Sequence, residues 1–176
     1  DPLGVAEIYG ADAVRMALIV GNTPGLDPVV SEDKIRAYRN FATKIRNAAK
    51  FVLTYIEPDS KIKPRFSKKD LDNLRELKIF KKEIERDIEN FRLHEASNKL
   101  YHYFWHVFAD KIIEESKPRL KENKDAADKA AAGETLLRML RELIKMLHPF
   151  MPFTTEEVYQ SLPDKKQTCL MAESWN

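Results

Sequence analysis

Seven cationic, amide and aromatic side chains recur at helical spacing within residues 31–56, SEDKIRAYRNFATKIRNAAKFVLTYI. An aromatic ring can stack on an unpaired base, carboxamides can hydrogen-bond to base edges, and cations can hold phosphates. This combination is typical of a surface that binds single-stranded nucleic acid. The candidate residues are Arg39, Asn40, Lys44, Arg46, Asn47, Lys50 and Phe51.

The same residues fit a second interpretation, a solvated helix face with Phe51 packed under a neighbouring helix. Under the first interpretation Phe51 and Asn47 face outward, and under the second Phe51 is buried. The helical wheel places one group beside the apolar stripe and the other opposite it. The first group is Arg36, Asn40, Lys44, Asn47 and Phe51, and the second is Arg39, Arg46 and Lys50.

The element that must position these side chains is one long helix. Ser31, followed by Glu32 and Asp33, predicts its N-terminus, because a hydroxyl can cap free amides and acids favour the first turn. Apolar residues then recur at i, i+4, i+7 and i+11 and form one stripe that faces a core. They are Phe41, Ile45, Ala48 and Val52.

Composition limits the class of protein. The chain has 176 residues, of which 43% are hydrophobic and 33% charged, enough for one domain with a core. No apolar run approaches the roughly 20 residues that span a bilayer. The single cysteine, Cys169, excludes an intrachain disulfide, so we expect a soluble, cytoplasmic protein.

Charge is distributed unevenly along the chain. The total is only +2, but residues 1–33 carry a net charge of −5 and residues 34–69 a net charge of +9. A concentrated basic segment indicates a polyanionic partner, and nucleic acid is the obvious candidate.

Further helices are predicted on both sides of this segment. The pattern indicates short helices over 5–9 and 11–20 and a long helix over about 69–90 with apolar positions from Leu71 to Phe91. An aromatic helix follows from 91 and ends at Lys117–Pro118, and its predicted core stripe is Ala96, Leu100, Phe104, Val107 and Ile112. Residues 121–133 are expected to form a loop or a frayed helix start. The last long helix carries four leucines at i, i+4, i+7 and i+11 and ends at His148–Pro149. These are Leu136, Leu140, Leu143 and Leu147.

The segment after that helix is predicted to contain the start of another helix and several core residues. Thr154 or Thr155 together with Glu157 predicts a capping box that starts one more helix. The apolar residues Phe150, Met151 and Phe153 are expected to fill the core. Trp175 is expected to anchor the polar tail.

Four stretches resemble class I aminoacyl-tRNA synthetases, and the valyl-tRNA synthetases in particular. Gly10–Arg15, GADAVR, resembles the GADALR signature that follows the catalytic domain. The next stretch, NTPGLDPVVSEDKIRAYRNFATKIRNAAKFVL, resembles these enzymes in its T-P-G-x-D turn and in the sequence of the following helix. The run FRLHEASNKLYHYFWHVFADKIIEESKPRL resembles a second element of the same enzymes. LHPFMPFTTEE resembles a run shared by valyl, leucyl and isoleucyl enzymes.

The resemblance covers nearly the whole chain and implies an all-α antiparallel helix bundle, the anticodon-binding domain of class Ia synthetases. It implies a bundle at 31–176, preceded at 1–30 by a small stem-contact segment that follows a catalytic domain. The implied partner is the anticodon stem-loop of tRNA-Val, and the protein that binds it is expected to be a monomer. Lys50 stands where relatives often carry Arg, so a phosphate contact is retained and planar stacking is lost.

Catalysis and metal binding are not expected. The sequence holds no HIGH-type or KMSKS-type run, Gly-rich phosphate loop or nucleophile elbow, so no catalytic residue is assigned. His102 and His106 are spaced i, i+4 but lack a catalytic glutamate between them and a third ligand nearby, so no metal is assigned. The implied parent enzyme uses ATP and Mg, and this chain, which begins at Asp1 and not at Met, is expected to be a piece of it.

Two alternatives remain open. The chain could be the same domain of an isoleucyl- or leucyl-tRNA synthetase, which the T-P-G-x-D turn and the wording around Asn47 argue against. It could also be a helical interaction module whose basic segment binds an acidic protein.

Overall fold

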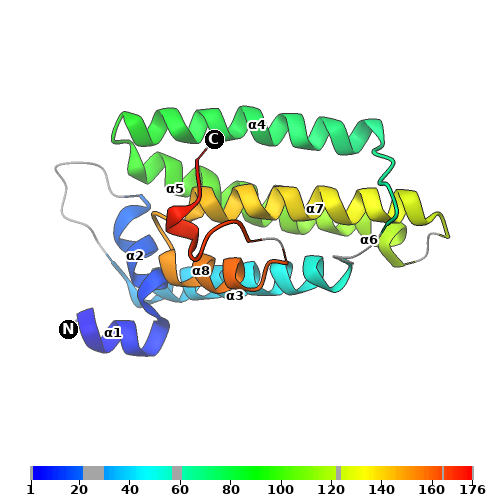
Figure 1. Ribbon diagram of the computed structural model, residues 1–176. Coiled ribbons are helices and arrows are strands. Elements are labelled where there is room, and N and C mark those ends of the chain that lie inside the picture. The colour runs from blue at the N-terminus through cyan, green and yellow to red at the C-terminus, as the bar shows by residue number, and fades with distance from the viewer. Residues whose placement is uncertain (1, 22–29, 57–60, 122–123, 164, 176) are drawn as a thin grey trace.

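The computed structural model describes residues 2–21, 30–56, 61–121, 124–163 and 165–175. Within these residues the regular structure is helical and no strand occurs (Figure 1). None of the described helices combines the length and the low polarity needed to cross a lipid bilayer. The elements are α1 Pro2–Tyr9, α2 Ala11–Ile19, α3 Glu32–Thr54, α4 Lys68–Glu89, α5 Leu93–His102, the π-helical segment η1 Tyr103–Ile113, α6 Glu114–Lys121, α7 Ala126–Leu147, α8 Pro152–Gln160 and the 3₁₀ turn η2 Leu170–Ala172.

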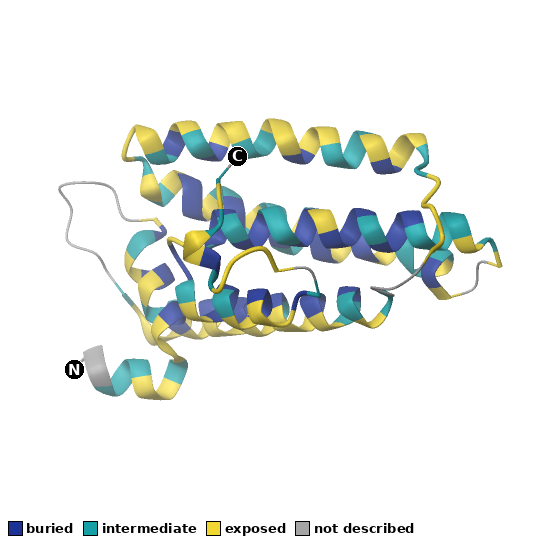
Figure 2. Cartoon of the chain, in the orientation of Figure 1, coloured by how far each residue is buried: buried dark blue, intermediate teal, exposed yellow. Residues whose placement is uncertain are grey.

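Long helices lie side by side, and successive members run in opposite directions (Figure 1). They are α3, α4, the continuous rod made of α5, η1 and α6, and α7. Helix α7 is central: its four predicted leucines are fully buried, and Figure 2 shows few exposed positions along it. The predicted all-α antiparallel bundle is therefore confirmed.

Helix α3 begins where the sequence places it. The Lys34 amide donates to Ser31 Oγ at 3.2 Å, which confirms the predicted cap. The predicted apolar stripe faces the core, with exposures between 0% and 7%. Its C-terminus lies against α7, where a Cβ added to Gly133 would come within 3.3 Å of the Tyr55 carbonyl oxygen.

The rod after α4 differs from prediction in two respects. Its last turn continues past Pro118 to Lys121, so the predicted end at Lys117–Pro118 is wrong. Proline removes a single N–H there, and tertiary contacts hold the turn: Leu120 is 1% exposed, and Arg119 forms two hydrogen bonds with Asp70, at 2.7 and 2.9 Å. Tertiary packing thus outweighs the local preference of proline.

The middle of the rod, η1, is π-helical, which the sequence pattern does not reveal. The wider turn changes which residues face the core: Phe108 is fully buried, whereas Val107, assigned to the stripe, is only half-buried. Phe104 and Ile112 are buried as expected. A π-helical segment frequently marks a functional region.

The ends of α4 also depart from the predicted stripe. Leu71 is 50% exposed and Phe91 86% exposed, so neither belongs to the core. Phe91 adopts φ 57°, the left-handed conformation common just after a helix end, and this geometry turns the chain into α5. At the start of α4, Ser67 and Asp70 form a capping box: the Asp70 amide donates to Ser67 Oγ at 3.2 Å, and the Ser67 amide donates to Asp70 Oδ2 at 2.8 Å.

Helix α7 begins at Ala126, so from Ala126 to Gly133 the prediction left open for residues 121–133 is decided in favour of a helix start. The side chain of Asp125 accepts hydrogen bonds from the Ala127 and Asp128 amides at 3.0 and 3.2 Å and caps the helix. Residues 126–133 are therefore the first turns of α7. Ala131 and Ala132 are almost fully buried, so small apolar side chains provide the packing there.

Helix α8 is capped by a distant residue, so the predicted capping box at Thr154 is wrong. The helix starts at Pro152, and the carboxylate of Asp12 in α2 accepts from the Thr154 amide at 2.6 Å and the Phe153 amide at 3.3 Å. Arg15 Nη2 donates to the Pro149 carbonyl at 2.9 Å. We call Asp12 and Arg15 the α2 clamp, because they fix the α7–α8 turn.

Packing around that turn confirms part of the prediction. Phe150 and Met151 are 1% and 0% exposed and fill the core, but Phe153 is 66% exposed, so its predicted burial is wrong. Helix α2 packs closely along α3. The division into 1–30 and 31–176 stays a prediction, and the predicted turn at 23–27 lies outside the described residues.

Candidate nucleic-acid interface on helix α3

The outward face of α3 carries most of the predicted site residues. Between Lys34 and Thr54 this helix has six basic residues and no acid. Its buried stripe fixes the helix rotation, so the polar residues must face away from the core. The exposed members are Arg39, Asn40, Arg46, Asn47 and Lys50.

Asn47 and Phe51 lie one turn apart near the C-terminal end of α3. Asn47 is exposed, and its carboxamide makes no hydrogen bond within the part of the chain that the structure describes. Phe51 is half-buried: one side packs against the core, and the remainder reaches the surface. The separation along the axis is about 6 Å, at about 1.5 Å per residue. Neither side chain is sealed inside the bundle.

Besides the core, the ring of Phe51 contacts one aromatic and one cationic side chain. Tyr55 lies 5.1 Å away between ring centroids, and Lys117 of α6 places Nζ 5.7 Å from the Phe51 centroid. An ammonium group over a ring face is attracted by the ring quadrupole. Lys117, which also pairs with Glu114 at 2.6 Å, therefore brings a cation to the aromatic end of α3. The sequence analysis missed it because Lys117 and Phe51 are far apart in the sequence.

Lys44 is on the flank that faces η1, and its charge is already paired. Its Nζ lies 2.6 Å from Asp110 Oδ1 and 5.4 Å from the centroid of Trp105. Trp105 in turn stacks on Phe41 with centroids 6.1 Å apart. Asp110 also lies 3.6 Å from His106 Nδ1. A phosphate contact by Lys44 must therefore compete with Asp110.

Arg46 is on the opposite flank, beside α8. Its Nε lies 2.7 Å from Glu157 Oε2, and Nη2 lies 3.5 Å from Thr154 Oγ1. The side chains of Arg46 and Glu157 remain 42% and 58% exposed, so this pair is a weak surface salt bridge. An incoming phosphate can replace Glu157 at low cost.

Arg39, Asn40 and Lys50, like Asn47, have few competing contacts. All three are exposed, and neither cation forms an ion pair with the described residues. Arg39 also lines a hollow of ≈ 460 Å³ bounded by the α1–α2 turn and the exposed ring of Phe153. The structure therefore divides the predicted residues between two flanks: Asn40, Lys44, Asn47 and Phe51 face η1 and α6, and Arg39, Arg46 and Lys50 face α8.

No metal centre emerges from the described residues, since no three His, Cys, Asp or Glu side chains come together there. The His102 and His106 rings stack with centroids 5.6 Å apart on the exposed surface of the rod. The arrangement on α3 can bind and position a polyanion with unpaired bases. It provides no group poised for covalent chemistry.

Comparison with known proteins agrees with this geometry. Residues 70–176 match the profile of the family described as "Anticodon-binding domain of tRNA ligase". The chain belongs to that family.

Among curated proteins, the chain is similar to valine–tRNA ligases. It is 38% identical over 172 residues to the one from Clostridium tetani, covering 96% of this chain and 19% of that protein. It is 37% identical to the one from Thermotoga maritima, covering 98% of this chain and 20% of that protein. The chain thus spans about one fifth of the length of these relatives.

Solved structures show the same fold at lower identity. The LeuRS–tRNA–LeuAMS ternary complex of Agrobacterium radiobacter K84 matches with a TM-score of 0.71 and 23% identity, over 100% of this chain and 20% of that chain. The methionyl-tRNA synthetase of Mycobacterium tuberculosis in its apo form matches with a TM-score of 0.72 and 23% identity, over 90% of this chain and 34% of that chain.

Proposed function

We propose that this chain is the anticodon-binding domain of a valine–tRNA ligase and that it binds the anticodon stem-loop of tRNA-Val. In this proposal a catalytic domain elsewhere in a cytoplasmic, monomeric parent enzyme carries out aminoacylation with ATP and Mg. The identities of 34–39% to valine–tRNA ligases over nearly the whole chain support it. The bundle would hold the tRNA so that its acceptor end reaches the distant active site.

The single observation that carries the recognition step is the pair at the end of α3. An exposed carboxamide, Asn47, stands one turn from the partly open ring of Phe51, on a helix that carries cations and no acid between Lys34 and Thr54. An unpaired anticodon base would stack on Phe51, which contributes roughly 1–3 kcal/mol, and Asn47 would hydrogen-bond to a base edge. Lys50 and Arg39, on the neighbouring flank of α3 that faces α8, would hold phosphates.

Two of the seven candidates have a smaller role in this proposal. Lys44 and Arg46 already pair with Asp110 and Glu157, so binding RNA exchanges one anion for another. Their contribution to affinity should be smaller than that of Lys50. Asn40 lies two turns before Asn47 on the same flank and would contact the loop only if the RNA extends along α3.

The test is a titration of the chain with the valine anticodon stem-loop and with a stem-loop of altered loop sequence. We expect Phe51→Ala to weaken binding of the valine stem-loop by about tenfold, the equivalent of about 1.4 kcal/mol of lost stacking. Phe91→Ala is the matched control, because it removes an equally large, 86% exposed ring in the turn between α4 and α5, away from α3. Equal affinity for the two stem-loops would remove base recognition from the proposal.

Three further readouts separate the alternatives. If Phe51→Ala leaves RNA affinity unchanged and only lowers the melting temperature, Phe51 serves the core. Stem-loops of leucine and isoleucine tRNAs test the related synthetases directly. Affinity that does not fall as salt rises would contradict a phosphate-bound partner, because counterion release supplies part of the binding free energy.

A further inference from the structure

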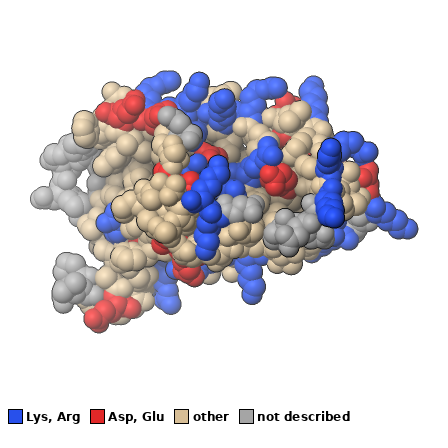
Figure 3. All heavy atoms as spheres, in the orientation of Figure 1, with Lys and Arg blue, Asp and Glu red and all other residues tan. Residues whose placement is uncertain are grey.

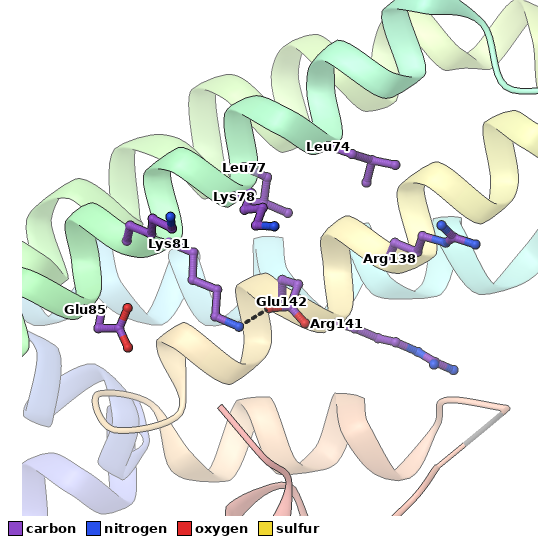
Figure 4. A pocket seen from close by; sticks show the side chains of 9 residues that line it. Leu74, Leu77, Lys78, Lys81, Glu85, Arg138, Arg141 and Glu142 are labelled. Atoms are coloured by element: carbon purple, nitrogen blue, oxygen red, sulfur yellow. Dashed lines mark hydrogen bonds and ion pairs between the residues drawn. The ribbon is translucent and has the colours of Figure 1, made fainter. Parts of the chain in front are cut away.

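A second basic surface lies away from the α3 face, between α4 and α7 (Figure 4). This hollow has a volume of ≈ 650 Å³ and is lined by those two helices alone. Helix α5 also packs against both of them but contributes no residue to the hollow. The lining residues are Leu74, Leu77, Lys78, Lys81, Lys82, Glu85, Arg138, Arg141 and Glu142. We call it the α4–α7 groove.

The groove combines apolar side chains with an excess of cations. Leu77 is 3% exposed and Leu74 is half-buried, and both extend from α4 toward α7 (Figure 4). Five lining residues are basic and two are acidic. Lys78 and Lys82 are exposed and form no ion pair with the described residues. Figure 3 shows Lys and Arg side chains projecting along the edge formed by α4.

One of the two acids is neutralised within the bundle. Glu142 lies 2.7 Å from Lys81 Nζ and 2.8 Å from Lys145 Nζ. Burial opposes the charged form of Glu142, but the two lysine hydrogen bonds outweigh it and lower the pKa of this carboxyl. Glu142 therefore stays ionised and paired, and the groove keeps a positive potential.

One end of the groove already holds a polypeptide segment. Lys81 Nζ lies 5.3 Å from the ring centroid of Trp175 and donates to the Trp175 carbonyl, and Lys145 Nζ donates to the Ser174 carbonyl at 3.3 Å. Trp175 also packs against the core, which agrees with its predicted anchoring role. At this end of the groove Lys81 thus holds an aromatic ring and a backbone carbonyl, and the neighbouring Lys145 holds a second carbonyl.

We propose that the α4–α7 groove docks an acidic amphipathic helix of a protein partner. From Leu74 to Glu85 the groove is about 16 Å long, which is three turns of helix. Apolar residues at i, i+3 or i+4, and i+7 would pack on Leu74 and Leu77, and carboxylates on the flanks would pair with Lys78 and Lys82. This binding does not depend on the RNA-binding role of α3.

RNA fits this groove less well. The apolar side chains of the groove cannot hydrogen-bond to or pair with the phosphates of RNA, and Glu85 adds a second carboxylate to the lining. A peptide helix can place an uncharged or basic residue opposite Glu85, whereas RNA carries a negative charge at every nucleotide. The occupied end also favours polypeptide, because the lysines there bind backbone carbonyls.

The test uses the full chain and a fluorescein-labelled helix of about 12 residues, enough for three turns, with Leu on one face and Glu on the other. Fluorescence anisotropy should show saturable binding, and the same helix with Lys in place of Glu should not bind. Lys78→Glu with Lys82→Glu should weaken binding by about tenfold. Lys68→Glu with Lys121→Glu, both exposed and outside the groove, is the charge-matched control and should change the affinity less than about twofold.

Circular dichroism of each variant verifies the fold, since all four lysines are on the surface. The proposal is overturned if the acidic helix does not bind, or if both double variants weaken it equally. It is also overturned if an oligouridine displaces the helix and loses its own affinity in the Lys78→Glu, Lys82→Glu variant, because the groove would then be a nucleic-acid surface.

Discussion

Removing the carboxylate of Asp12 should destabilise the chain by an amount that the structure allows us to estimate. Asp12 is 4% exposed and caps α8 from α2. After Asp12→Ala, the Thr154 amide has no acceptor, and Thr154 is only 1% exposed, so water cannot replace the carboxylate. Phe153 is 66% exposed, so its amide can hydrogen-bond to water instead. One buried hydrogen bond to a charged group is worth about 1.5–3 kcal/mol, so we expect a loss of about 2–3 kcal/mol.

Urea denaturation followed by far-ultraviolet circular dichroism measures this loss. Asp12→Asn keeps an acceptor oxygen but removes the charge near the helix N-terminus, so it should cost about 1 kcal/mol. Asp72→Ala is the matched control: its carboxylate accepts from Arg75 at 3.1 Å on the surface, and its removal should cost less than about 0.5 kcal/mol. If Asp12→Ala is as mild as Asp72→Ala, the cap has no energetic role and our reasoning fails.

Three further substitutions test the interior. Arg119→Met should cost about 3 kcal/mol near neutral pH, because it leaves the buried carboxylate of Asp70 unpaired. Burial opposes ionisation of Asp70, but the hydrogen bonds from Arg119 and Ser67 lower its pKa, so the deficit should shrink in urea titrations as the pH falls through about 4. Burial lowers the pKa of His148; the unfolded chain therefore binds the proton first, and wild-type stability should fall below about pH 6.5, a decline that His148→Gln reduces in the same titration. Gly133→Val should cost about 1–3 kcal/mol by crowding the end of α3, measured as a lower melting temperature, and an unchanged value would contradict the close packing there.

The repeating patterns were predictable because they depend on local geometry. The stripe of α3 and the four leucines of α7 follow from 3.6 residues per turn, and a serine before two acids is sufficient to place the start of α3. The end of α7 at His148–Pro149 was predictable for the same reason, since proline lacks the backbone N–H and disfavours continuation of a helix. The resemblance to known synthetases supplied the function, which spacing alone could not provide.

The errors arise where distant residues override local preference. Thr154 fits the sequence pattern of a helix cap, but Asp12 accepts the hydrogen bond of the Thr154 amide from another helix. No sequence rule indicates such a distant cap. Pro118 suggested a helix end, but the salt bridges of Arg119, the next residue, hold the helical turn in place. They connect to residues 49 and 9 positions away, which the local sequence does not reveal. The π-helical turn left no signal in the apolar spacing, so Phe108 was not assigned to the core.

The candidate site was predicted in part. The outward position of Asn47 and the partial exposure of Phe51 follow from the same helical wheel that places the core stripe. The pairing of Lys44 with Asp110 and of Arg46 with Glu157 joins residues 66 and 111 positions apart, which a single sequence cannot reveal. How each residue contacts RNA stays a prediction.

The α2 clamp has a consequence for the order of folding. Its hydrogen bonds join residues 134 to 142 positions apart, so they can form only after most of the chain has been synthesised. Hairpins such as α4–α5 close short loops and can assemble early, and α2 can likewise pack on α3, whereas the clamp must wait for the α7–α8 turn. Attachment of α2 to α8 is therefore expected to be a late kinetic step, and the α7–α8 turn should remain open to protease until it is complete.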